Sequence, residues 1–221
     1  MYSDEEGTGK DWDDWLKAGI FYVFGFVYMC SRIAMNATAV FIPLYIASMT
    51  SKSSEEGEAA ETNFQVATVP LTAYTSSLLW SLFGQQWMNR KFESSRLIPL
   101  IIALAVTFVA SAPFLFFNSE NHLSMYVYPC VSVQGIGIAL MLNTSVSLIS
   151  DVIGTDNKSS AFVYGVYSLL DKFANGFILW WLVRNYSKDV TALRCILAII
   201  PTLSALGCAL MTWFGIRLYA D

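Results

Sequence analysis

Charged residues are scarce in this chain of 221 residues, at 14% of the sequence, where about 25% is usual for soluble domains. Hydrophobic residues make up 55%, and the mean hydropathy is +0.50. This balance excludes an ordinary soluble domain and predicts a polytopic membrane protein. The net charge of -4 comes largely from two acidic stretches, residues 4–14 and 55–61, and no basic patch compensates it. Nucleic-acid binding is therefore not expected.

Residues that build catalytic or metal sites are also few. The only histidine, His122, has no neighbours in the sequence from which a Ser/His/Asp, zinc or phosphate-loop arrangement can be assembled. The cysteines have neither C-x-x-C spacing nor the density of a disulfide framework; they are Cys30, Cys130, Cys195 and Cys208. We therefore expect no enzymatic activity, no metal site and no cofactor.

Long apolar runs dominate what is present. A window of about 19 residues predicts six transmembrane helices at residues 18–46, 64–83, 97–117, 123–149, 161–183 and 195–216. The expected fold class is thus an all-α membrane protein, with a six-helix bundle over residues 16–221 behind an acidic cytosolic segment at residues 1–15. The second span is the least apolar, because it carries several Ser and Thr residues, which commonly let helices pack closely or line a polar path.

The distribution of Lys and Arg outside the spans predicts the orientation. One side of the membrane would carry seven of them and the other four. The cytosolic side is usually the richer one, so we expect both termini and the segments 84–96 and 150–160 to be cytosolic. The seven are Lys10, Lys17, Arg90, Lys91, Arg96, Lys158 and Arg217, and the four are Lys52, Arg184, Lys188 and Arg194.

Three charges interrupt the apolar spans. Asp171 and Lys172 lie near the centre of the span 161–183, and Arg32 lies within the span 18–46. Each such charge costs roughly 2.5–3.5 kcal/mol at the centre of a membrane helix on insertion scales. We therefore expect these side chains to face a protein-lined or water-filled cavity and to mark a path for substrate or ions. An ion pair that only holds two helices together is the alternative.

Helical spacing places other polar residues beside these charges. Tyr167 and Asn175 share one face with Asp171, whereas Lys172 follows a face about 100° away. In the first span, Tyr28, Arg32 and Asn36 are four residues apart and predict a phenol, a guanidinium and an amide on one cavity. Because Arg binds a carboxylate through its two-pronged fork and Lys offers a compact charge, a carboxylate-bearing solute is the natural partner.

The fourth span carries a further polar stripe. Asn143, Ser147 and Asp151 are spaced four residues apart, so Asn143 is a candidate for the same cavity. Asp151 lies at the expected cytosolic end, where it would support a gate by holding the following loop or capping the next helix. Arg90, in the predicted loop after the second span, is the other candidate for a cytosolic gate.

Several motifs resemble the family of major facilitator superfamily domain-containing protein twelve. They are Ser150-Asp-Val-Ile-Gly154, Ser160-Ala-Phe-Val-Tyr-Gly165 and Ser168-Leu-Leu-Asp-Lys-Phe-Ala-Asn-Gly176, with support from Phe21-Tyr22, Tyr28-Met29 and Val69-Pro70-Leu71. The stretch from Gly84 to Lys91 is similar to the gating loop of that superfamily, but it has Asn89 where an acid is usual. The span with Lys172 is more distantly similar to the eleventh helix of the glycoside–pentoside–hexuronide cation symporters.

The resemblance implies one half of a larger transporter fold. It implies the C-terminal six-helix half, whose binding site lies at the interface with an N-terminal half. It also implies import of cysteine into lysosomes or related organelles by alternating access. The expected partners are a small organic solute, membrane lipid, and the N-terminal half or a partner chain. A cation-coupled sugar or other solute symporter, a scaffold subunit without transport activity, and residence in the plasma membrane remain alternatives.

Overall fold

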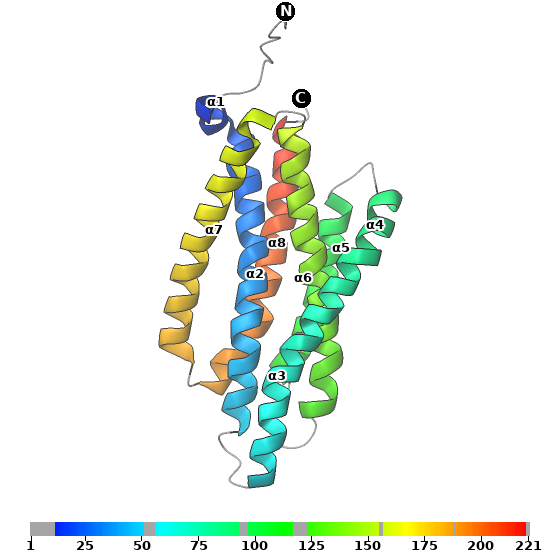
Figure 1. The fold of residues 1–221 in the computed structure, drawn as a ribbon, viewed down its shortest axis with the longest axis vertical. Helices are drawn as coiled ribbons and strands as arrows, with labels where there is room; N and C mark the ends of the chain where they lie inside the picture. Colours follow the sequence, from blue (N-terminus) through cyan, green and yellow to red (C-terminus); the bar gives the residue numbers. More distant parts are fainter. Residues whose placement is uncertain are drawn as a thin grey trace, which may run out of the picture.

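The chain folds into a bundle of long helices (Figure 1). The computed structural model describes residues 12–50, 56–92, 97–116, 123–154, 157–187 and 189–219. The segment expected at residues 1–15 lies mostly outside these residues, as does His122. No strand occurs in the described part of the chain, so the predicted all-α class is confirmed. The helices are α1 (Trp12–Lys17), α2 (Gly19–Thr50), α3 (Glu56–Leu79), η1 (Trp80–Gly84), α4 (Gln85–Lys91), α5 (Leu97–Phe116), α6 (Leu123–Ile153), α7 (Asn157–Tyr186) and α8 (Val190–Tyr219).

Five of the helical stretches in the described residues are long and apolar enough to cross a membrane. They correspond to five of the six predicted spans and lie at Gly19–Ser48, Phe64–Met88, Leu97–Phe116, Tyr126–Asp151 and Val190–Arg217. The remaining predicted span, 161–183, falls within α7, which has 30 residues and hence the necessary length. This stretch is less apolar than the five above and is not among the helices that composition marks as membrane-spanning. The predicted number of six transmembrane helices is therefore not confirmed.

Residues 84–91 differ from the sequence prediction, which placed them in a loop. The chain stays helical from α3 through the π-helical turn η1 into α4, which ends at Lys91. Gly84 permits this path, because an added Cβ would lie 2.5 Å from the ring of Trp80. A single π-helical turn within an α-helix often accompanies a functional site. Similarly, α6 continues to Ile153, so only a short connection separates it from α7.

The core lies along α2, which packs against α8, α6, α3 and α7. Buried apolar side chains of α2, α5, α6 and α8 form one cluster, which includes Val27, Leu100, Met141 and Cys208. Polar side chains also join the helices: the hydroxyls of Ser31 on α2 and Ser145 on α6 are 3.0 Å apart. Such hydrogen bonds help to fix helix neighbours in a membrane, where no hydrophobic driving force brings helices together.

Two helices stand at the edges of the bundle with wide exposed faces. In Figure 1, α7 lies beside α2 on one side and α3 runs along the other. The buried residues of α7 follow one another at intervals of four or seven positions, so they lie on one face of the helix. On its other faces, Phe173 and Phe177 are 72% and 68% exposed. The exposed large residues of α3 include Leu71, Leu78 and Leu79. Both helices thus keep broad apolar surfaces that the described residues do not cover.

Candidate functional site

An ion pair links the middle of α2 to the middle of α7. Arg32 Nε donates a hydrogen bond to Asp171 Oδ2 over 3.2 Å. The Asp171 side chain is 4% exposed, whereas the Arg32 side chain is 31% exposed. The structure therefore brings together the two charges from these separate predicted spans, and it leaves part of the guanidinium available to another partner.

The stripe that carries Asp171 holds α7 against α2. Asn175 Nδ2 donates to both the backbone carbonyl and Oδ1 of Asp171, so the carboxylate is hydrogen-bonded from two helices. One turn before Asp171, the buried Tyr167 hydroxyl donates to the carbonyl of Phe21 over 2.6 Å. The ring of Tyr167 also stacks beside that of Tyr28, with centroids 6.4 Å apart. Tyr167 thus packs in the interface between the two helices.

Arg32 lines a cavity of about 390 Å³, which we call the arginine cavity. It lies between α2, η1 with the start of α4, and α6. Asn143 lines it, and its Nδ2 donates to Ser81 Oγ over 2.9 Å. The complete lining is Tyr28, Arg32, Ser81, Gln85, Leu142, Asn143, Val146 and Ser147. Because Asp171 approaches Arg32 from α7 and does not line this cavity, the guanidinium stands between a carboxylate and an open polar space.

The other predicted site residues lie elsewhere. Lys172 is exposed on the face of α7 next to that of Asp171, and no ion pair of Lys172 occurs among the described residues. Asn36 is half-buried on α2 and does not line the arginine cavity. Arg90 and Asp151 are exposed, near the ends of α4 and α6. The structure therefore groups Tyr28, Arg32 and Asn143 around one cavity, with Asp171, Asn175 and Tyr167 behind it.

Some residues of the arginine cavity were not predicted. Gln85 lines it from α4, but the sequence placed that residue in a loop outside the bundle. Ser147 stands one turn after Asn143 on the same stripe of α6, so its spacing was a usable signal. In the described part of the chain, no three His, Cys, Asp or Glu side chains gather as ligands of a metal would.

Comparison with known proteins finds three relatives that bear the same name. The chain is 32% identical to mouse (Mus musculus) major facilitator superfamily domain-containing protein 12 over 168 residues, which cover 75% of this chain and 32% of the relative. The human (Homo sapiens) protein of that name is 29% identical over 170 residues, and the horse (Equus caballus) protein is 32% identical over 165 residues. The matched region spans about a third of the length of these relatives. No family model matches the chain, and no solved structure matches it.

The resemblance inferred from the motifs is thereby confirmed. The chain is a homologue of proteins that carry a major facilitator superfamily domain, and it is an integral membrane protein with several spanning helices.

Proposed function

We propose that this homologue of major facilitator superfamily proteins is the C-terminal half of a secondary transporter for a small organic solute, with cysteine as the leading substrate. The observation that carries the proposal is the Arg32–Asp171 pair, because it places opposite charges beside an open cavity halfway along α2. Charges at this depth are expensive and commonly mark a transport path. The relationship to the three relatives supports the same class of protein.

The ion pair offers a way to exchange partners. A carboxylate that enters the arginine cavity reaches a guanidinium that is already held by Asp171 from the opposite side. Arg can bind a second carboxylate because it has five N–H donors in a planar fork. A zwitterion such as cysteine brings a carboxylate for Arg32 and an ammonium group that attracts Asp171. Binding would then loosen α7 from α2, and this movement provides a gate for alternating access.

The exposed helices supply the surface for a second half. Transporters of this kind bind their substrate between two repeats, and α3 and α7 carry large apolar residues that nothing in the described chain covers. Lys172 lies on the exposed side of α7, so a partner bundle on that side would bring Lys172 into the shared interior. There it would be a second site for the solute carboxylate, and Arg90 and Asp151 would act at the cytosolic edge. The partner is an N-terminal six-helix half or another chain.

We place the protein in the membrane of the lysosome or a related organelle, with residues 84–96 on the cytosolic side. Cysteine would then move from the cytosol into the lumen. This assignment follows from the family resemblance and from the larger number of Lys and Arg residues on the side of both termini.

Uptake of labelled cysteine into proteoliposomes tests the proposal. The chain is reconstituted alone and joined to the N-terminal six-helix half of a relative, and Arg32→Met and Lys172→Met are compared with the parent. Arg217→Met, at the exposed end of α8, is the matched control for loss of a cation. We expect uptake by the joined form, a loss of at least tenfold in Arg32→Met and Lys172→Met, and unchanged uptake in Arg217→Met.

Two other results would redirect the assignment. If a well-folded joined form takes up another solute but not cysteine, the transporter stands and the substrate is wrong. If it takes up no solute, and Arg32→Met changes only its thermal stability, the pair holds helices together and a scaffold subunit is the better description.

A further inference from the structure

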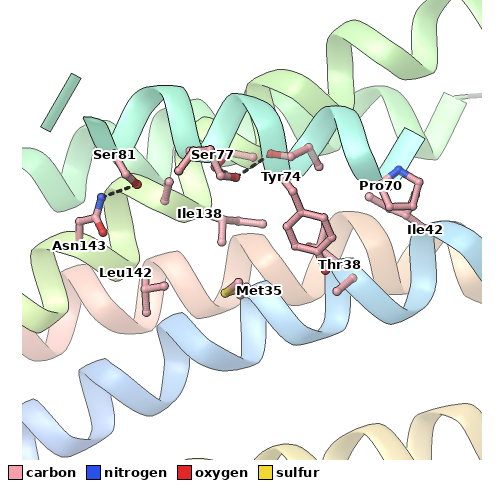
Figure 2. A pocket seen from close by; sticks show the side chains of 15 residues that line it. Met35, Thr38, Ile42, Pro70, Tyr74, Ser77, Ser81, Ile138, Leu142 and Asn143 are labelled. Atoms are coloured by element: carbon pink, nitrogen blue, oxygen red, sulfur yellow. Dashed lines mark hydrogen bonds between the residues drawn. The ribbon is translucent and has the colours of Figure 1, made fainter. Parts of the chain in front are cut away.

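A second cavity lies directly beside the arginine cavity, and its lining is mainly apolar. It has a volume of about 250 Å³ and lies between α2, α3 with the start of η1, and α6 (Figure 2). We call it the apolar cavity. Its walls include Met35, Ala39, Ile42, Tyr74 and Ile138. A volume of this size is several times the roughly 30 Å³ that a water molecule occupies in the liquid.

One side chain in the wall of the apolar cavity lacks a partner. Thr38 is 5% exposed, and its Oγ1 makes no hydrogen bond within the described residues. In Figure 2, the Thr38 side chain and the ring of Tyr74 point toward one another within the cavity. A buried hydroxyl that finds no acceptor or donor is costly. A thiol bound in the apolar cavity would provide a partner, since S–H is a weak donor and sulfur a weak acceptor.

The two cavities share part of their walls. Leu142, Ser81 and Asn143 line both of them. Arg32 reaches the boundary as well, because its Nη1 lies 3.9 Å from the sulfur of Met35, which lines the apolar cavity. A solute held by the guanidinium can therefore extend an apolar part past Met35 into the apolar cavity.

We propose that the apolar cavity is the side-chain subsite of the transporter. It selects α-amino acids with an apolar or thiol side chain, whose carboxylate binds Arg32. This inference rests on the proposed function, since it assigns the substrate class of the same site. Cysteine fits it, because an uncharged thiol is a weak hydrogen-bonding group that behaves as a small apolar one. The cavity also has room for side chains longer than that of cysteine.

Binding of a homologous series to the joined form in lipid nanodiscs tests this subsite, because the proposed site lies between the two halves. The probes are alanine, 2-aminobutyrate, norvaline and norleucine, with cysteine and serine for comparison, and calorimetry gives their dissociation constants. Burial of each added methylene should raise the affinity roughly fourfold. Serine should bind more weakly than cysteine, because its strongly hydrated hydroxyl loses more on entering a mainly apolar lining than one hydrogen bond to Thr38 Oγ1 returns.

A cavity-filling variant locates the effect. Ala39 lines the apolar cavity but not the arginine cavity, so Ala39→Leu should remove the rise in affinity along the series. The same substitution at Ala105, an exposed position on α5, should leave the rise intact. Thermal unfolding of both variants checks that they fold.

The results separate this inference from the proposed function. The subsite is wrong if the affinities depend on Arg32 but do not increase along the series. It is also wrong if the affinities still increase along the series in a folded Ala39→Leu variant. Either result leaves the transporter assignment in place. If none of the probes binds, the subsite and cysteine as substrate are both wrong, and the uptake experiment decides separately whether the transporter assignment stands. The affinities measured along the series on the joined form without substitutions decide whether the subsite exists, even where a variant does not fold.

Discussion

At the scale of single residues, two tyrosines with similar sequence signals have different surroundings. Tyr28 and Tyr167 both stand four residues from a charge in a membrane helix, and both were predicted to face the cavity. Tyr28 lines the arginine cavity. The hydroxyl of Tyr167 instead donates to the backbone of α2 at Phe21, and its ring fills the space above Gly25, where an added Cβ would be 2.8 Å away.

Replacement of each tyrosine by phenylalanine should therefore give different results. Tyr167→Phe removes a buried hydrogen bond, so the free energy of unfolding should fall by about 1 kcal/mol, with little change in the dissociation constant for cysteine. Tyr28→Phe should weaken cysteine binding several-fold and leave the unfolding temperature nearly unchanged. Thermal unfolding and calorimetry of both variants measure the two quantities. If Tyr167→Phe weakens cysteine binding more than Tyr28→Phe does, Tyr167 contacts the substrate and this prediction is wrong.

At the scale of helices, close approach between α6 and α3 forms one wall of the apolar cavity. A Cβ added at Gly135 would lie 2.5 Å from the carbonyl oxygen of Ala73, which is backbone and cannot rotate away. Ser77 Oγ strengthens this contact, because it donates to the carbonyl of Gly135 over 3.0 Å. Small residues at such positions let helix backbones approach within a membrane.

Gly135→Ala should therefore push α3 away from α6. We expect a loss of about 1–3 kcal/mol in the free energy of unfolding, as in overpacked cores. Gly165→Ala on α7 is the matched control, because an added Cβ there meets nothing within 4 Å, and alanine is the better helix former. Thermal unfolding of the two variants in one detergent gives the comparison. Equal stability would show that α3 can move without cost.

The helices themselves could be predicted from the sequence, but their mutual contacts could not. Apolar runs located five spans, because hydropathy over a window depends on composition alone. The predicted second span ended before Gly84, because a glycine and a gating-loop pattern normally signal the end of a helix. In the structure the helical path continues through η1 and α4. Spacing placed Arg32 and Asp171 on polar faces, but these residues are 139 positions apart. Which faces meet depends on how each helix is rotated by packing, and spacing within one helix does not contain that information.

At the scale of the whole molecule, pairs of aromatic and cationic residues mark the two ends of the bundle. Lys91 Nζ lies 4.8 Å from the ring centroid of Trp87 on α4, and Arg217 Cζ lies 4.5 Å from that of Trp213 on α8. Arg184 Cζ lies 5.4 Å from the ring of Trp180 near the end of α7. Figure 1 shows that α7 runs from the end of the bundle near the C-terminus toward the opposite end, where α8 begins. Trp at the level of lipid headgroups, with Lys and Arg beside it, is typical of the membrane interface.

These pairs predict the topology without reference to any substrate. A membrane-impermeant maleimide should label Lys91→Cys and Arg217→Cys from one side of the membrane, and Arg184→Cys from the other. All three side chains are exposed, and the parent chain measures background from its own cysteines, of which Cys30 and Cys208 are buried. In isolated organelles, labelling of Lys91→Cys and Arg217→Cys without permeabilisation would place them in the cytosol, as the excess of Lys and Arg predicts.

If Arg184→Cys is labelled together with Lys91→Cys, α7 does not cross the membrane. Asp171 would then not lie at the depth that a transport path requires, and the transporter assignment would lose its main physical support.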